Sequence, residues 1–391
     1  MTVFKLAVKN LLGAGMRTWL NVIVLSFSFV LIIFFQGLLE GTNRQVTKDM
    51  VDTAYGGGQI WHEEYDAYDP LTLQDAHGKI PEEIQALIEK DQAVPILILQ
   101  GSIYPEGRFL SILLKGIPPG QKVLNFPMES LDVDGPEIPV MIGTRMAKDA
   151  GLEEGETVMV RWRDADGTFD AQQAKVVKIF KTSVQAVDNG QFWIPLERLQ
   201  KMGRMEGEMT FAVLGKEVSP PAMESGWLYR DLDFLLSDLI TMINSKKYGS
   251  SIYYVILIFM AMLAIFNTQL LSIFRRRKEM GTLMALGFTR GKVIRLFTLE
   301  GAMHAVLAAL VGALYGGPLL IWTNVKGIAL PGSYDQWGFA MGDKLIPVYT
   351  GGLIIGTTIL VLLITTVVSF LPTRKIAKLK PTDALRGRFS T

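Results

Sequence analysis

The 391-residue sequence contains no cysteine and only three histidines, His62, His77 and His304. Without cysteine, neither a disulfide nor a thiolate can contribute to stability or chemistry. The absence of cysteine also suits a large domain that faces an oxidising space. His62 precedes two glutamates, but no second histidine stands at ligand spacing and H-E-x-x-H does not occur. We therefore expect no metal site, and we interpret His62-Glu63-Glu64 as a surface loop.

Charged residues are missing from four long apolar stretches. Each has 21 to 24 residues without Asp, Glu, Lys or Arg: Trp19–Leu39, Ile252–Phe274, Gly301–Trp322 and Val348–Leu371. A helix needs about 20 residues to cross about 30 Å of hydrocarbon. The sequence therefore predicts four transmembrane helices. The first stretch is too long for a signal-peptide core and no A-x-A follows it, so we expect it to remain as an anchor.

The charges are segregated along the chain. Residues 1–17, 275–298 and 373–391 together hold 16 basic and 2 acidic residues, whereas the remainder has a net charge of −13. Basic loops stay in the cytoplasm, so these three segments are predicted to lie on that side. The predicted order is an interfacial helix over 1–18, spans over 19–39, 252–274, 301–322 and 348–371, outer segments over 40–251 and 323–347, a cytoplasmic loop over 275–300 and a cytoplasmic tail over 372–391.

The long outer segment has the pattern of an α+β domain. Its predicted strands are Val94–Tyr104, Leu110–Ile117, Glu156–Arg163, Gln173–Phe180 and Phe192–Ile194, with Pro105-Glu106-Gly107 as a turn and short helices over Pro81–Lys90 and Thr144–Ala150. Asp164, Asp166 and Gly167 resemble part of a calcium loop, but the closing glutamate is absent, so a hairpin turn is expected. The predicted fold is an α-helical membrane protein with four transmembrane helices and a periplasmic α+β domain on a helical stalk.

The stalk is predicted from an apolar stripe just before the second span. Its members follow helical i, i+3, i+4, i+7 spacing: Leu232, Leu235, Leu236, Leu239 and Ile243. We expect this stripe to pack on Gly41–Val51, the extension of the first span, from the same or a neighbouring chain. Within the membrane, Gly312 and Gly316, and Gly352 and Gly356, are small-xxx-small pairs that favour close helix packing.

Two further sequence features have open interpretations. Glu300 and His304 stand four residues apart at the inner mouth of the third span, as a functional ionisable pair or as a helix start with a packed histidine. In the cytoplasmic loop, Met280, Leu283, Met284 and Leu286 form an apolar face that Gly287 terminates. This segment is either a positive-inside anchor with a helical loop or a helix that docks into a groove on a cytoplasmic partner.

The loop and the tail resemble the FtsX-like permeases, the family that includes MacB-type and LolC/LolE-type subunits. The loop contains R-R-R-K-E-M-G-T-L-M-A-L-G-F from Arg275 to Phe288, and the tail contains P-T-D-A-L-R from Pro381 to Arg386. The resemblance implies that the loop is a coupling helix that inserts into a separate ATPase. The residues to which it assigns this role are Glu279, Met280, Gly281, Leu283, Met284, Ala285, Leu286 and Gly287.

The resemblance also implies an ABC transporter permease that has no catalytic role of its own. No G-x-x-x-x-G-K-[ST] occurs, so ATP and magnesium are expected on the partner ATPase, in two copies, and no cofactor in this chain. A second permease chain, identical or paralogous, completes the expected complex in the bacterial inner membrane, with no role for nucleic acid. The length is closest to LolC/LolE-type subunits, which favours lipoprotein release. MacB-like efflux of a periplasmic substrate and FtsX-like control of a cell-wall hydrolase are the alternatives.

Overall fold

The computed structural model describes residues 15–133, 135–182, 184–222, 225–245, 277–329 and 344–377, with scattered helical residues between 249 and 270. The predicted second span, residues 252–274, lies largely outside the described residues. So do residues 1–14 of the predicted interfacial helix, 330–343 of the short outer loop and 378–391 of the tail. The chain divides into a helical unit (Met1–Asn43, Ile243–Leu330 and Lys344–Thr391) and a second unit, the sheet domain, that contains Arg44–Met242.

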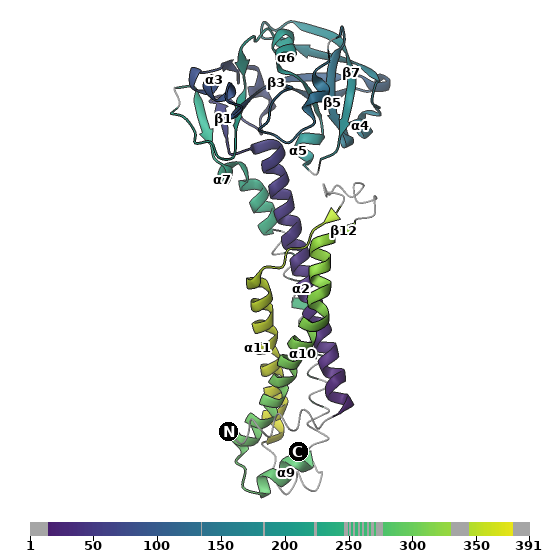
Figure 1. Cartoon of the computed structure of the whole chain (residues 1–391), viewed down its shortest axis with the longest axis vertical. Coiled ribbons are helices and arrows are strands. Elements are labelled where there is room, and N and C mark those ends of the chain that lie inside the picture. The colour runs from purple at the N-terminus through teal and green to yellow at the C-terminus, as the bar shows by residue number, and fades with distance from the viewer. Residues whose placement is uncertain are drawn as a thin grey trace. The chain divides into compact units, whose positions relative to one another are not determined.

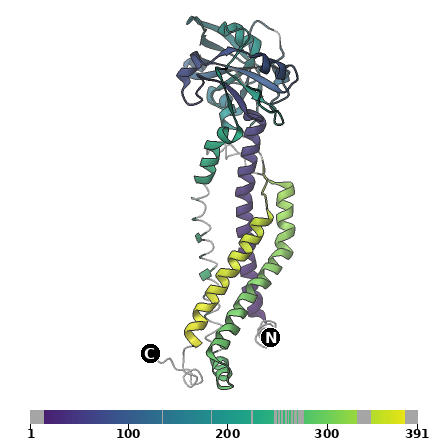
Figure 2. The same ribbon diagram turned by 90° about the vertical axis from the view of Figure 1, so that its left-hand side faces the viewer.

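Long apolar helices make up the helical unit. Its elements are α2 (Met16–Met50, which continues into the sheet domain), α9 (Arg277–Ala285), α10 (Arg290–Lys326), α11 (Gly351–Ala377) and the short strands β12 (Ile328–Ala329) and β13 (Lys344–Leu345). Three helices in the described part of the chain are long and apolar enough to cross a membrane. They cover most or all of the first, third and fourth predicted spans. Helix α10 packs along α11 (Figure 2).

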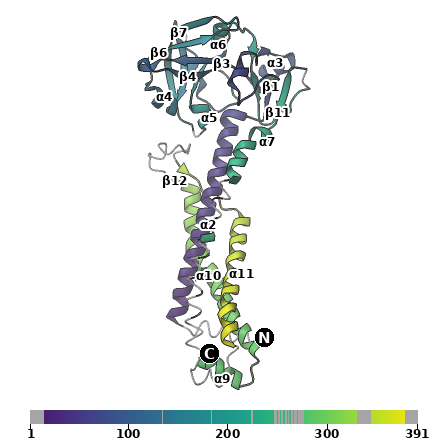
Figure 3. The ribbon, with the colours of Figure 1, turned by 180° about the vertical axis from the view of Figure 1, so that it is seen from behind.

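The core of the helical unit is built from one face of each long helix. Val22, Leu25, Phe29 and Ile32 of α2 are buried together with Ala305 and Ala308 of α10 and Val361 of α11. Larger side chains of α10 point away from this core: Leu310 is 64% exposed and Leu314 is 80% exposed. Figure 3 shows the three helices from behind. Small residues inside and leucines outside are typical of helices whose surroundings are lipid.

The sheet domain has short helices around curved strands (Figure 1). The strands are β1 (Gln59–His62), β2 (Gly78–Lys79), β3 (Ala93–Ile103), β4 (Leu110–Ile117), β5 (Ile138–Gly143), β6 (Thr157–Arg163), β7 (Phe169–Phe180), β8 (Gln191–Pro195), β9 (Glu208–Met209), β10 (Phe211–Leu214) and β11 (Trp227–Arg230). The helices and turns are η1 (Val51–Tyr55), η2 (Pro70–Gln74), α3 (Glu82–Ile88), η3 (Pro105–Gly107), η4 (Met128–Leu131), α4 (Thr144–Ala150), α5 (Gln185–Asp188), α6 (Leu196–Gly203) and α7 (Leu232–Leu235).

Six strands of this domain close into a barrel. Within the described residues, the main sheet has nine strands in the order β11-β1-β10-β3-β4-β8-β5-β7-β6, and β6 also pairs with β3. The last pairing joins the two ends of the run from β3 to β6. Strand β3 can pair with both β10 and β6 because it has 11 residues. Its first part pairs with β10 and its last part, Gly101–Ile103, pairs with β6. Closure leaves β6 without a free edge, whereas β11 stays at the other end of the nine-stranded sheet.

Alternation along the strands produces two separate cores. In β6, Val158, Val160 and Trp162 are buried between exposed neighbours, so one face of the strand lines the barrel interior. In β8, Phe192 and Ile194 face the interior, whereas Trp193 belongs to a second core outside the barrel. The two cores explain why β5 and most of β8 are buried on both faces.

The structure matches several of the predicted elements. Strand β4 and helix α4 have the predicted bounds, and β3, β6 and β8 differ from the predicted strands by about one residue at an end. Pro105–Gly107 and Asp164–Gly167 are turns, as predicted, and the second is held by a bond in which the Thr168 amide donates to Asp164 Oδ1 at 2.7 Å. The strands β1, β5, β10 and β11 were not predicted.

Candidate functional site

The predicted coupling segment forms a helical hairpin with the start of α10. Helix α9 ends at Ala285, and the amide of Phe288 donates to the Leu283 carbonyl at 3.0 Å. Gly287 has φ 91°, a backbone conformation that L-residues other than glycine rarely adopt. The chain therefore reverses at Gly287 and enters α10 at Arg290.

The apolar residues of this segment are divided between two environments. Leu283 and Met284 are partly buried against the α10 residues Val293, Leu296 and Phe297. Part of the predicted apolar face, Leu283 and Met284, therefore has a partner within the chain. Leu283 and Met284 are adjacent on α9, so one turn of this helix supplies the contact with the start of α10. The side chain of Met280 lies outside the described residues.

The remaining face of the segment is exposed. Leu286 is 74% exposed, and Glu279, Thr282 and Ala285 are also exposed. Gly281, within α9, is buried. A partner protein can reach Leu286 without disturbing the contact between α9 and α10. We call Glu279, Thr282, Ala285 and Leu286 the α9 outer face.

The residues of the predicted stalk are only partly brought together. Leu235, Leu236 and Leu239 are buried, whereas Leu232 and Ile243 are partly buried. Leu235 packs in the second core of the sheet domain with Trp61 and Phe211. Helix α7 is capped by Asp231, whose Oδ1 accepts from the Phe234 amide at 2.8 Å. A role of these residues in transmission stays a prediction.

The two glycine pairs occupy different surroundings. Gly312 and Gly316 of α10 face α2: a Cβ on Gly312 would lie 3.6 Å from the Ser26 Cβ, and a Cβ on Gly316 would overlap the Val30 side chain. Gly352 and Gly356 of α11 have no atom within 4 Å of such a Cβ among the described residues. Only the first pair therefore brings two described helices close together.

The histidines occupy three different sites. His62 ends β1, packs edge-to-face on Trp227, and burial lowers its pKa. His304 Nδ1 donates to the Glu300 backbone carbonyl at 2.7 Å, so the two residues form a local helical contact. Both are buried. In the described part of the chain, no three His, Asp or Glu side chains are grouped to hold a metal ion.

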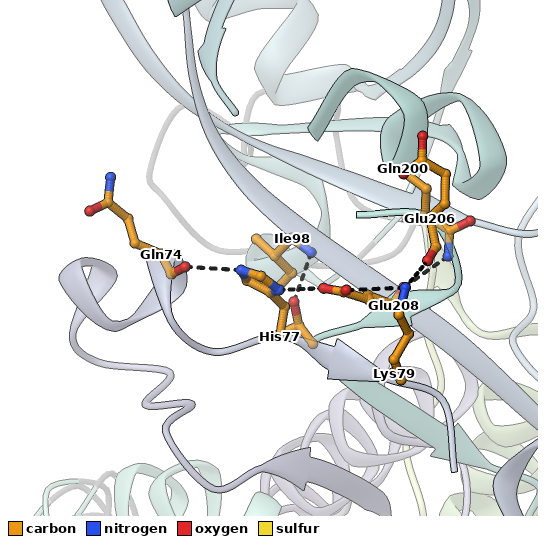
Figure 4. Close-up of polar contacts among 8 residues, drawn as sticks. Gln74, His77, Lys79, Ile98, Gln200, Glu206 and Glu208 are labelled. Carbon is orange, nitrogen blue, oxygen red and sulfur yellow. Dashed lines mark hydrogen bonds and ion pairs between the residues drawn. The ribbon is translucent and has the colours of Figure 1, made fainter. Parts of the chain in front are cut away.

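His77 belongs to a polar cluster that joins β2 to β9 (Figure 4). Its Nδ1 lies 2.6 Å from Glu208 Oε2, and its Nε2 lies 3.0 Å from the Gln74 carbonyl. Lys79 Nζ donates to the Glu206 carbonyl at 2.5 Å and lies 3.3 Å from Glu208 Oε1. Each ring nitrogen faces an acceptor, so the imidazolium form can donate to both. The cluster fastens β2 to β9.

Part of the helical unit matches a known protein family. Residues 251–381 match the family described as FtsX-like permease C-terminal. The lipoprotein-releasing system transmembrane protein LolC of Xylella fastidiosa is 23% identical over 323 residues, 74% of this chain and 75% of that protein. An uncharacterized ABC transporter permease of Methanocaldococcus jannaschii is 27% identical over 228 residues, 54% of this chain and 55% of that protein.

One solved structure resembles part of the chain. The extracellular domain of the noncanonic ABC-type transporter YknZ from Gram-positive bacteria gives a TM-score of 0.27 at 16% identity, and the match covers 41% of this chain and 84% of that domain.

The family match, the similar relatives and the three apolar helices define the class of protein: the chain is an ABC transporter permease subunit. Within that class, residues 251–381 are an FtsX-like permease domain. The resemblance to FtsX-like permeases and to LolC-type subunits that the sequence predicted is therefore confirmed. This domain begins before α9 and includes α10 and α11.

Proposed function

We propose that this permease works with a separate ATPase, in two copies, which binds ATP and magnesium and docks on the α9 outer face. The observation that supports this proposal most is the position of Leu286 within the FtsX-like segment, 74% exposed on the hairpin. A single exposed leucine is common on protein surfaces; Leu286 supports docking because it lies in the segment that the family resemblance assigns to contact with the ATPase. The sequence around the segment is basic and is expected to lie in the cytoplasm.

The contact between α9 and α10 offers a route for motion. A push on α9 reaches Val293, Leu296 and Phe297, which are buried beneath it. Helix α10 then continues without a break for 37 residues, a rise of about 55 Å. The movement of the ATPase is thus carried along α10 toward the other face of the membrane. The predicted stalk, Leu232 to Ile243, carries the motion of the second span in parallel.

For the process that this motion drives, we propose lipoprotein release from a bacterial inner membrane, with the sheet domain in the periplasm. The match to LolC covers 75% of that protein, which is named for a lipoprotein-releasing system. A second permease chain, identical or paralogous, completes the complex. MacB-like efflux and FtsX-like control of a cell-wall hydrolase are alternatives. ATP-dependent release of a lipoprotein from vesicles that contain the reconstituted complex separates the first process from the other two.

Docking can be tested by a substitution that leaves the hairpin intact. We expect Leu286→Glu to abolish co-purification of the ATPase, because a charge buried without a partner typically costs several kcal/mol. Membrane insertion and the α9–α10 contact should not change, since Leu286 does not contribute to that contact. Leu71→Glu is the matched control: Leu71 is 79% exposed in the sheet domain.

Leu283→Glu has a different expected result. Leu283 packs on α10, so this variant should destabilise the hairpin as well as reduce ATPase binding. Proteolytic cleavage between α9 and α10 should increase for Leu283→Glu but not for Leu286→Glu. Full ATPase binding by Leu286→Glu would show that the α9 outer face is not the docking surface.

A further inference from the structure

The sheet domain contains a cavity of about 480 Å³ outside the barrel, beside the end of α2. Its wall is rich in aromatic side chains: Tyr55, Trp61, Tyr65, Trp193, Phe211 and Phe234. Several of these rings contact one another, such as Trp61 and Tyr65 with centroids 4.9 Å apart. The volume and the apolar wall are typical of sites for small molecules, which range from about 300 to 1,000 Å³.

One lysine interrupts this apolar wall. Lys115 of β4 is paired across the sheet with Ile98 of β3 and Trp193 of β8, both buried. Along its own strand, the residues on the same face are Leu113 and Ile117. Lys115 therefore lies among apolar side chains on its face of the sheet. Its Nζ lies 5.3 Å from the centre of the Trp193 ring.

Lys115 has no anionic partner in the described part of the chain. No ion pair or hydrogen bond of Lys115 occurs there, and its contact with Trp193 is a cation–π interaction. Burial lowers the pKa of Lys115 to about 8. Lys115 is partly buried, and a lysine in such a position without a carboxylate is costly; an anion in the cavity would reduce that cost.

The other charged groups near the cavity do not neutralise Lys115. The lining carboxylates, Asp66 and Asp238, are exposed, and each accepts a hydrogen bond from Tyr68, Asp66 from its amide and Asp238 from its hydroxyl. Behind the wall, the Arg230 guanidinium lies 4.4 Å from the Phe234 ring centre, and its buried Nε has no hydrogen-bond partner among the described residues. Lys115 and Arg230 thus both lie against the aromatic wall, whereas the lining carboxylates are exposed and hydrogen-bonded to Tyr68.

We propose that this cavity binds a single-chain amphiphile whose anionic head group pairs with Lys115 while its apolar chain lies against the aromatic wall. Two sources supply this chemistry, a free fatty acid and a lysophospholipid. The site lies wholly within the sheet domain and is separate from the α9 outer face. The inference therefore does not depend on the proposed ATPase partner or on the proposed substrate.

Competition binding to the full chain in lipid nanodiscs tests the proposal. Radiolabelled dodecanoate should bind saturably, with one molecule per chain, above the amount taken up by empty nanodiscs. Unlabelled dodecan-1-ol, which has the same chain without a charge, should compete at least tenfold less well than unlabelled dodecanoate. Lysophosphatidylglycerol forms the second arm: the better competitor of the two anions identifies the source of the ligand.

Two variants separate the charge from the space. Lys115→Met should weaken dodecanoate binding at least tenfold and remove the preference over dodecan-1-ol, whereas Lys115→Arg should retain the preference. Ala54→Phe, which fills the cavity from η1, should abolish binding while Lys115 remains. Circular dichroism and size-exclusion profiles check that each variant is folded. Absence of saturable binding, equal competition by the alcohol, or unchanged binding by both Lys115→Met and Ala54→Phe would overturn the proposal.

Discussion

The two units of the chain differ in where their large apolar side chains lie. The barrel of the sheet domain encloses large side chains such as Phe192 and Leu114, both fully buried. The helical unit encloses small residues such as Ala305 and Ala308 and leaves Leu314 80% exposed. Water drives large apolar side chains inward, whereas lipid does not, and close helix packing then depends on small residues. The difference teaches that a large apolar side chain indicates the core in the sheet domain, whereas in the helical unit it can lie in the core or on the outer surface.

The largest expected effect comes from a cavity in the barrel. Phe192→Ala removes a fully buried ring, and such a change typically lowers the free energy of unfolding by about 3–5 kcal/mol. Urea unfolding of the full chain in nanodiscs, followed by tryptophan fluorescence, measures the effect. Phe109→Ala is the control, because Phe109 is 64% exposed. Equal losses for the two variants would contradict the assignment of the barrel interior as the main core.

The second prediction concerns the lysine in the second core. The pKa of Lys115 is lowered from 10.5 to about 8, so between these values the unfolded chain binds more protons than the folded chain. The free energy of unfolding should therefore rise as the pH increases from about 8 to about 10.5. Below pH 8 the buried charge is destabilising, and without ligand Lys115→Met should stabilise the domain by on the order of 2–3 kcal/mol.

Lys175→Met is the matched control for this prediction. Lys175 lies on β7 between the buried residues Ala174 and Val176, but it is exposed to solvent. Its replacement should change the free energy of unfolding by less than about 0.5 kcal/mol. The same urea titration, repeated at pH 7 and pH 10, compares the variants. Tyrosines also titrate near pH 10, so the test is the difference between Lys115→Met and wild type: a difference that does not shrink from pH 7 to pH 10 would contradict the lowered pKa of Lys115.

The third prediction concerns close packing in the helical unit. Gly316→Leu places a side chain where Val30 of α2 already lies, and overpacking of this kind typically costs about 1–3 kcal/mol. Gly317→Leu, one residue further along α10, meets open space and should have little effect. Heating the protein in nanodiscs and following loss of helical circular dichroism compares the two. A tolerated leucine at position 316 would show that α2 and α10 do not meet there.

The absence of native cysteine permits a direct check of the same contact. A Cβ on Gly312 would lie 3.6 Å from the Ser26 Cβ, within the range of about 3.5–4.5 Å found in disulfides. The pair Ser26→Cys with Gly312→Cys should therefore cross-link under mild oxidation. Ser26→Cys with Gly317→Cys should not, since position 317 faces away from α2.

The smallest expected effect is the loss of a helix cap. Asp231→Ala removes the bond from the Phe234 amide to the Asp231 carboxylate at the start of α7, a loss of about 1 kcal/mol. Amide hydrogen exchange should increase in α7 and remain unchanged in the barrel. Asp233, in the same turn, accepts no such bond among the described residues, so Asp233→Ala is the control. Increased exchange throughout the domain would mean that α7 supports the barrel.

Periodicity and charge predicted much of the fold from the sequence. Strand β4 was predicted because the turn residues Pro105 to Gly107 separate it from the preceding apolar run, and the structure pairs it antiparallel with β3. Strand β5 was missed because it is buried on both faces, so its residues do not alternate. Apolar composition predicted three spans that the structure describes as helices, since lipid requires long uncharged runs.

The sequence by itself determined the class of protein, because the motif from Arg275 to Phe288 and the uncharged runs are local features of the chain. Tertiary structure alone decided which of those local features have partners. Leu283 and Leu286 look alike in the sequence, but only Leu283 is covered by α10. Lys115 reads as an ordinary strand lysine, and its burial follows from the pairing of β4 with β3 and β8. Whether a side chain is exposed or covered depends on residues distant in sequence, and no local pattern contains that information.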